Sequence, residues 1–260
     1  MLSNRTPAAF LEYNERLAAS AQAHPDVVGL VLVGSAADTA RADEWSDHDF
    51  FLIVKDGMAE GFRQDLSWLP DASDVVIRPR ETAHGLKVVY RDGHVLEFAV
   101  FDDHELELAS VNYWAVPVDK TNITSRVAAL EKKTVGPAFE EQKEWELLLA
   151  HILIGVGRAR RGEVLIAGQQ IRSYMLRHVV GFVRDRLVPA TGAEKIEDNL
   201  DRYRRFEQQY PAEGARLDMI LQLPVEDAAM ALLDFTLGLG GFSDLQHEQA
   251  EVVRRRLGWS

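Results

Sequence analysis

The sequence contains no cysteine and no long uncharged hydrophobic run. Because cysteine is absent, a disulfide framework, a thiolate zinc site, an iron–sulfur cluster and a cysteine nucleophile are all excluded. No segment approaches the roughly 18 uncharged residues that a membrane-spanning helix needs, and residues 1–23 lack the continuous apolar core of a signal peptide. We therefore expect a soluble protein of the cytoplasm without a membrane partner.

Basic side chains are scarce relative to acidic ones. The chain has 29 lysines and arginines against 41 aspartates and glutamates, which gives a formal net charge of −12. A surface that binds nucleic acid needs lysine and arginine to neutralise phosphates, so this balance argues against a general nucleic-acid partner. It favours a cationic small molecule instead. Residues 1–135 carry most of the excess, with 22 acidic and 13 basic side chains.

The first half of the chain alternates helix and strand signals. Amphipathic spacing predicts a helix over residues 7–23, and a second helix is expected over residues 58–68. The predicted strands are residues 27–34, 49–54, 74–80, 86–91 and 94–101. The Asp92-Gly93 dipeptide between the last two strands is a strong hairpin signal. We therefore expect a sheet that is mixed or antiparallel.

From residue 136 onward, apolar residues recur at helical spacing. The residues that show it are Trp145, Leu148, Leu149, Ile152, Val164, Ile171, Met175 and Phe182, and later helices are predicted over residues 226–237 and 243–257. We place the boundary between the two domains near residues 134–137, where lysines, a glycine and a proline follow the last strand-like segment. We predict an α+β protein in which a mixed-sheet domain, residues 1–135, is followed by an all-helical bundle, residues 136–260.

The chemistry-bearing residues begin where the first predicted strand ends. Gly34 and Ser35 follow that strand, and the next strand opens with Asp47-x-Asp49 after a polar loop. Residues i and i+2 of a strand point to the same side, so the two carboxylates share one face about 7 Å apart. With a third group opposite, such a pair can hold two Mg²⁺ ions. Gly34 lets a phosphate approach the backbone closely, and Ser35 can donate hydrogen bonds to it.

Glu97 supplies a third carboxylate. It interrupts an otherwise apolar run over residues 95–101, in which both faces are hydrophobic as in a central strand. A carboxylate buried there without a partner would be costly, so a metal ion or another cation is its expected compensation. An ion pair with Arg78 or Lys87 is the alternative.

These residues carry a resemblance to a known superfamily. Gly34-Ser35, a loop, Ser46-Asp47-x-Asp49 on a strand and Glu97 on a later strand resemble the nucleotidyltransferases of the DNA polymerase β type. The added helical half makes the chain most similar to the bacterial aminoglycoside and lincosamide nucleotidyltransferases. The resemblance covers roughly residues 27–102.

The resemblance implies a function and a set of site residues. Two Mg²⁺ ions would be held by Asp47, Asp49 and Glu97, with Glu97 also a candidate general base. The nucleotide ATP would be contacted by Gly34, Ser35 and Ser46 through its triphosphate and, in the segment at residues 114–120, by Asp119. The implied reaction is adenylylation of a hydroxyl group on a small molecule, for which an aminoglycoside or lincosamide antibiotic is the suggested acceptor, with the helical half supplying specificity.

One departure from the superfamily pattern keeps a second function open. In the superfamily the loop after Gly-Ser commonly carries an arginine and a glycine. Here the loop, residues 36–41, has no glycine, and its arginine, Arg41, is displaced from the usual position. The alternative is a catalytically weak nucleotide-binding regulatory or antitoxin-like module with the same fold. Retention of all three carboxylates favours the enzyme. Transfer to RNA or to a protein side chain would keep the same chemistry, and the negative net charge argues against RNA.

Overall fold

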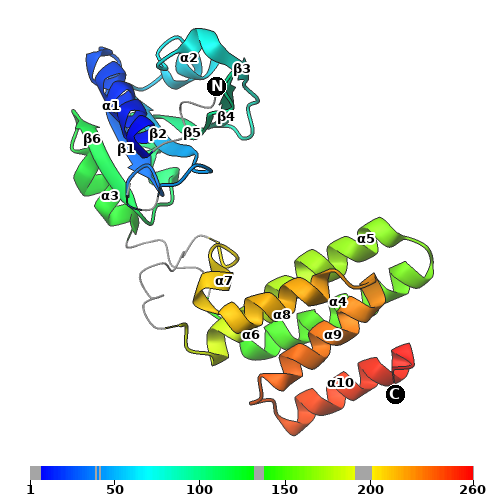
Figure 1. Ribbon diagram of the computed structural model, residues 1–260. Coiled ribbons are helices and arrows are strands. Elements are labelled where there is room, and N and C mark those ends of the chain that lie inside the picture. The colour runs from blue at the N-terminus through cyan, green and yellow to red at the C-terminus, as the bar shows by residue number, and fades with distance from the viewer. Residues whose placement is uncertain (1–6, 39, 41, 132–137, 191–200, 260) are drawn as a thin grey trace. The chain divides into compact units, whose positions relative to one another are not determined.

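The computed structural model describes residues 7–38, 40, 42–131, 138–190 and 201–259. The chain divides into two compact units, Met1–Val135 and Gly136–Ser260 (Figure 1). The described part of the first unit contains a mixed sheet with helices, and that of the second unit is helical. The predicted α+β class is therefore confirmed. The expected boundary near residues 134–137 lies outside the described residues.

The described residues of the first unit form a six-stranded sheet in the order β3-β4-β5-β2-β1-β6. Its strands are β1 (Val27–Val33), β2 (His48–Val54), β3 (Val75–Ile77), β4 (Gly85–Tyr90), β5 (Val95–Asp102) and β6 (Trp114–Asp119). Strands β2 and β5 pair in parallel, whereas the other neighbours are antiparallel. The parallel pair at the centre of the sheet places residues of two distant sequence segments directly opposite each other.

A hydrophobic core covers each face of this sheet. Side chains of α1 (Pro7–Ala23) and α2 (Ala59–Gln64) pack on one face, where Leu30 and Leu52 are fully buried. Side chains of α3 (Ile123–Glu131) pack on the other face. Because successive strand residues point to opposite faces, β2 directs His48 toward α1 and directs Asp49 to the opposite side.

Local sequence signals predicted most of these elements. The helix at residues 7–23 has its predicted bounds, and the Asp92-Gly93 hairpin joins β4 to β5. The strand predicted over residues 74–80 is shorter, because Pro79 has no N–H for the ladder and Arg80 forms only an isolated bridge. The helix predicted over residues 58–68 ends at Gln64, where the Asp65 carboxylate accepts the Ser67 N–H and turns the chain.

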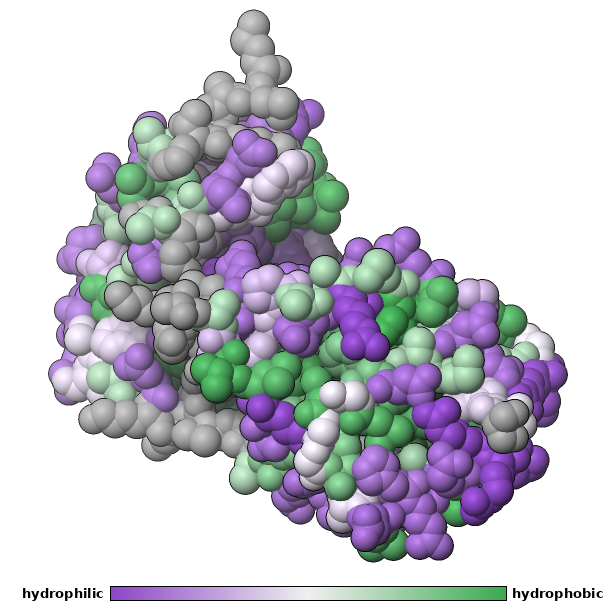
Figure 2. All heavy atoms as spheres, turned by 60° about the horizontal axis from the view of Figure 1, so that its bottom comes forward, coloured by the Kyte–Doolittle hydropathy of each residue, from purple (hydrophilic) through white to green (hydrophobic). Residues whose placement is uncertain are grey.

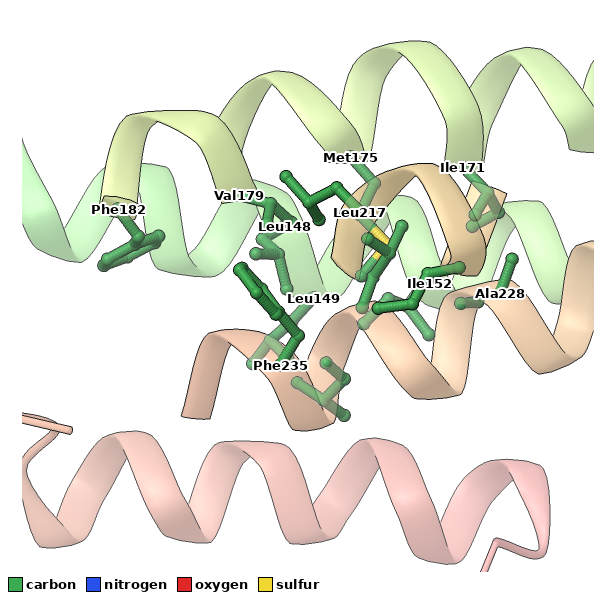
Figure 3. Packing of buried hydrophobic residues seen from close by; sticks show 14 of the residues in the cluster. Leu148, Leu149, Ile152, Ile171, Met175, Val179, Phe182, Leu217, Ala228 and Phe235 are labelled. Atoms are coloured by element: carbon green, nitrogen blue, oxygen red, sulfur yellow. The ribbon is translucent and has the colours of Figure 1, made fainter. Parts of the chain in front are cut away.

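The second unit is a bundle whose core is shown in Figure 3. Its helices are α4 (Glu141–Arg160), α5 (Val164–Gln169), α6 (Leu176–Arg186), α7 (Phe206–Gln209), α8 (Pro211–Leu221), α9 (Val225–Gly238) and α10 (Asp244–Leu257), and a π-helical segment, Gln170–Met175, joins α5 to α6. Leu148, Ile152 and Phe182 are fully buried among these helices (Figure 3). The sequence did not predict α7 and α8.

Truncation of a core side chain measures how strongly this unit depends on its packing. We expect Phe182→Ala to lower the free energy of unfolding by about 3–5 kcal/mol, because the ring is fully buried and its removal leaves a cavity. Denaturant titration followed by circular dichroism gives the value. Exposed Leu165→Ala in the same unit is the control, since Leu165 is 93% exposed and its loss should change little. Equal effects of the two substitutions would contradict the described core.

Among the described residues, no helix has the length and apolar character needed to cross a membrane. Figure 2 shows hydrophilic side chains spread over the visible face, with smaller hydrophobic areas between them.

Candidate functional site

Three carboxylates lie near the N-terminal ends of the two parallel strands, β2 and β5. Asp49 in β2 lies directly opposite Glu97 in β5, and Asp47 immediately precedes β2. One carboxylate oxygen from each side chain lies within 4.8 Å of one from each of the others. We call Asp47, Asp49 and Glu97 the carboxylate cluster. Like charges at this separation repel one another, so the cluster favours binding of a cation.

The structure corrects the prediction that Glu97 is buried. Its side chain is 48% exposed, because the core on this face of the sheet reaches Phe101 but does not extend over the start of β5. Lys87, its cross-strand neighbour in β4, places Nζ 3.6 Å from a Glu97 oxygen and 2.9 Å from a Glu81 oxygen. Hydrogen bonding to Glu81 and the charge of Glu97 raise the pKa of Lys87. Burial of Glu97 is therefore no reason to expect a metal ion there. The reason is that three carboxylates lie close together.

A glycine turn lies beside Asp49. Gly34 has φ of +59°, and a Cβ added at this position would lie 3.3 Å from Oδ2 of Asp49. The Ala36 N–H donates to the Val33 carbonyl across the turn at 3.2 Å. The Ser35 hydroxyl donates to the backbone carbonyl of Asp47 at 3.3 Å, which connects the turn to the loop that carries Asp47. Gly34 and Ser35 are thus next to the carboxylate cluster.

Ser46 takes part in the structure of its own loop. Its Oγ accepts the Asp43 N–H at 2.9 Å and lies 3.2 Å from Oδ1 of Asp43. It directly precedes Asp47, so it lies near the carboxylate cluster with its hydroxyl engaged locally. Thr39 and Arg41, in the loop that departs from the superfamily pattern, lie outside the described residues.

Asp119 is not brought to this site. It is paired with Gly29 in β1, whereas Asp49 is paired with Val33, about 13 Å further along the same strand. Its carboxylate accepts the N–H groups of Ile123 at 2.8 Å and Thr124 at 3.0 Å, at the start of α3. The Asp119 side chain satisfies the first amides of a helix, away from the carboxylate cluster, and its contact with the nucleotide stays a prediction.

Asp119→Ala tests this structural role. We expect the free energy of unfolding to fall by about 1 kcal/mol, as for loss of a helix cap, with nucleotide affinity unchanged. Hydrogen bonding from Thr124 lowers the pKa of Asp119 in the folded protein. The stabilisation is therefore present above the unfolded pKa of about 3.9 and is lost as pH falls through the folded pKa. Urea titrations at neutral and acidic pH measure it; weaker nucleotide binding in the variant would contradict this assignment.

A cavity of 240 Å³ lies beside Asp49 and Glu97, whereas Asp47 lines a different cavity, of 480 Å³. The walls of the smaller cavity include Val33 and Phe51 in addition to Asp49 and Glu97, and Glu81 and Thr82 from the segment before β4. Phe51 could have been expected from strand alternation, two residues after Asp49. Glu81 and Thr82 could not, because their position depends on how the β3–β4 connection folds back over the sheet.

Comparison with known proteins gives matches only among solved structures. No known protein-family profile matches this sequence. No curated protein matches it either.

Three of the matching structures illustrate the similarity. An aminoglycoside 6-adenyltransferase from Bacillus subtilis is 11% identical, with 96% of this chain and 98% of that chain covered and a TM-score of 0.36. A nucleotidyltransferase-like protein from Exiguobacterium sibiricum is 14% identical (94% and 79% covered, TM-score 0.31). A STING-associated c-di-GMP synthase from Capnocytophaga granulosa is 14% identical (95% and 80% covered, TM-score 0.28). Similarity at this level of identity and TM-score does not bear on the superfamily, the activity or the substrate of this chain.

Proposed function

We propose that this protein is an ATP-dependent nucleotidyltransferase that uses Mg²⁺ to adenylylate a hydroxyl group of a small molecule. The observation that carries the proposal is the carboxylate cluster, with oxygens of Asp47, Asp49 and Glu97 within 4.8 Å of one another. Mg²⁺ prefers carboxylate oxygens as protein ligands and is often bound together with substrate phosphates.

The geometry of the carboxylate cluster fits such ions. Oxygens that share one Mg²⁺ at about 2.1 Å lie no more than about 4.2 Å apart, so small side-chain rotations bring these three into range. Glu97 is half-exposed and has room for that rotation. Its ion pair with Lys87 is also exposed, and such pairs contribute at most about 1 kcal/mol. The carboxylate can therefore exchange Lys87 for a metal ion.

Each residue then has a defined task in the transfer. Bound Mg²⁺ would neutralise the triphosphate charge and align the α-phosphate. Asp49 in β2 and Asp47 just before it would hold the metal. The Ser35 amide would donate to the phosphates, and the Ser35 hydroxyl would exchange the Asp47 carbonyl for a phosphate oxygen. Glu97 would also accept the proton of the acceptor hydroxyl. The acceptor oxygen bonds to the α-phosphorus, the bond to the β-phosphate oxygen breaks, and pyrophosphate leaves.

The acceptor class follows from charge. The chain is strongly acidic, and residues 1–135 contain most of the excess negative charge. A cationic acceptor such as an aminoglycoside suits this balance. The resemblance, and not the charge, is the reason for assigning acceptor specificity to the helical unit, residues 136–260. This assignment makes the protein a candidate cytoplasmic antibiotic-resistance enzyme without a nucleic-acid partner.

A turnover assay with an acceptor panel tests the proposal. The protein is incubated with ATP and Mg²⁺ and with individual aminoglycosides and lincosamides, and pyrophosphate release is measured. We expect release with at least one acceptor and none when Mg²⁺ is removed by a chelator. Tight ATP binding without turnover for any acceptor would overturn the enzyme in favour of the nucleotide-binding module suggested by the altered loop at residues 36–41.

The proposed exchange of Lys87 for a metal ion at Glu97 leads to a separate prediction. We expect Lys87→Met to strengthen Mn²⁺ binding, by no more than about fivefold, because it removes a competing cation whose exposed ion pair is worth at most about 1 kcal/mol. Mn²⁺ titration followed by electron paramagnetic resonance measures it. Lys55→Met, which breaks the exposed pair with Asp26, is the matched control and should leave the affinity unchanged. Weaker binding in Lys87→Met would instead show that Lys87 holds Glu97 in its binding position.

A further inference from the structure

A pair of histidines lies behind the carboxylate cluster, on the opposite face of the sheet. His48 stands between Asp47 and Asp49 in the sequence, yet its ring points toward α1 and is only 1% exposed. His94 immediately precedes β5, the strand that carries Glu97. Nε2 of His94 lies 2.7 Å from Nδ1 of His48. One hydrogen bond therefore links the beginnings of the two strands that bring the carboxylates together.

The partners of the two rings define their protons. Nε2 of His48 lies 3.1 Å from the Phe10 carbonyl in α1, and a carbonyl can only accept, so Nε2 carries the proton. His48 is only 1% exposed and stacks on the Phe10 ring, an environment that favours the neutral imidazole. Its Nδ1 is then an acceptor, and Nε2–H of His94 is the donor. The two hydrogen bonds thus run in one direction. His94 in the β4–β5 hairpin donates to His48 in β2, and His48 donates to the Phe10 carbonyl in α1.

Ring contacts surround this hydrogen bond on several sides. The Phe10 ring stacks on His48 with centroids 3.7 Å apart, and the Tyr13 ring lies 4.8 Å from His48 and 4.6 Å from His94. The Tyr90 hydroxyl donates to the Pro70 carbonyl at 2.8 Å, so the Tyr13 hydroxyl must be the donor to Tyr90, also at 2.8 Å. The histidine pair and the Tyr13–Tyr90 pair are therefore neighbouring directed hydrogen bonds on this face of the sheet.

We propose that the His94–His48 hydrogen bond is a positioning device for the metal site: it fixes the start of β5 against the start of β2 and so sets the separation of the Glu97 and Asp49 carboxylates. The inference rests on the proposed function, because it assumes that these carboxylates bind a metal ion. His48 pairs with Leu96, and the next register step pairs Asp49 with Glu97. A shift of the hairpin at His94 would therefore displace Glu97 relative to Asp49.

The test compares variants that keep or lose the donor at position 94. His94→Phe keeps a ring but cannot donate, and His94 borders a cavity of 480 Å³ that gives the larger ring room. His94→Gln places an amide donor near the position of Nε2. We expect His94→Phe to weaken Mn²⁺ binding about tenfold and to lower kcat similarly, as for loss of a partner that orients metal ligands. His94→Gln should restore both, and the KM for ATP should stay close to the wild-type value throughout.

A matched control separates positioning from general stability. Tyr13→Phe removes the neighbouring Tyr13–Tyr90 hydrogen bond and leaves the histidine pair intact. We expect a lower melting temperature with unchanged Mn²⁺ affinity. Equal losses of affinity in Tyr13→Phe and His94→Phe, or wild-type affinity in His94→Phe, would overturn the inference. If His94→Phe does not fold, His94→Asn, whose amide is too short to reach His48, replaces it with the same expectation.

The result also distinguishes this inference from the proposed function. Asp49→Asn is titrated with Mn²⁺ alongside the variants. If the wild-type protein binds Mn²⁺ no more tightly than Asp49→Asn, the metal site itself is absent and the proposed function fails. If Asp49→Asn loses binding while His94→Phe keeps it, the metal site stands and only the positioning role of the histidine pair is overturned.

Discussion

Asp49→Asn is expected to lower acceptor-dependent pyrophosphate release at least about a thousandfold, which corresponds to about 4 kcal/mol of transition-state stabilisation. Asp49 lies opposite Glu97 in the parallel strand pair and contributes an oxygen to the carboxylate cluster. The asparagine amide has the same shape but no negative charge, so it is a much poorer ligand for Mg²⁺. Folding should change little, because the substitution keeps the side-chain volume.

Asp56→Asn provides the matched control for this loss. Asp56 lies just beyond the other end of β2, is 65% exposed, and pairs with His104. The same chemical change there should leave pyrophosphate release unaltered. Single-turnover assays of both variants at saturating ATP separate loss of chemistry from loss of nucleotide binding. Wild-type turnover in Asp49→Asn would refute the assignment of the metal ligands.

Gly34→Ala is expected to reduce kcat about a hundredfold, since a displacement of about 1 Å at a reacting group can cost that much. The new Cβ would lie 3.3 Å from Oδ2 of Asp49, and φ of +59° is a conformation that side chains other than glycine rarely adopt. The left-handed conformation costs about 1–2 kcal/mol for alanine. Either Asp49 moves or the turn relaxes, and both changes disturb the surroundings of the phosphates.

Gly57→Ala separates the two contributions of that substitution. Gly57 has φ of +81°, and an added Cβ would meet no atom within 4 Å. It should show a comparable loss of stability in thermal unfolding, with kcat unchanged. Equal losses of kcat in the two alanine variants would mean that Gly34 matters only for folding, and that the turn has no special relation to the carboxylate cluster.

Local sequence patterns predicted the elements of the sheet better than its connections. The apolar run of β1 and the Asp92-Gly93 hairpin are local signals, and both predictions are confirmed. The parallel pairing of β2 with β5 is a contact between segments almost fifty residues apart. Strand order of this kind depends on long-range packing, so neither the spacing nor the periodicity of the sequence could give the register that places Asp49 opposite Glu97.

The errors have the same physical origin. Glu97 was predicted to be buried because its neighbours are apolar on both sides, but cover over a sheet face depends on helices and loops from elsewhere in the chain. The local role of Asp119 was not predicted either, because its carboxylate caps the start of α3, a contact that depends on where that helix begins. For α8, Pro211 at the first turn was a usable start signal that the apolar periodicity alone did not reveal.

The site was predicted in part. Strand alternation put Asp47 and Asp49 on one face beside the glycine turn, and the interrupted apolar run together with the resemblance to the superfamily added Glu97 as the third carboxylate. Lys87 was recognised only as one alternative partner of Glu97. The histidine pair was not predicted, because His94 reaches His48 only after the hairpin of β4 and β5 has docked beside β2.

The metal site itself is tested most directly by crystals grown with Mn²⁺ and a non-hydrolysable ATP analogue. Anomalous scattering from Mn²⁺ locates the ion without reference to any activity. We predict an anomalous peak that contacts oxygens of Asp47, Asp49 and Glu97 at about 2.1 Å, with the phosphates of the analogue beside Gly34 and Ser35. An ordered analogue bound elsewhere, with no anomalous peak among these carboxylates, would contradict the proposed metal-dependent nucleotidyl transfer.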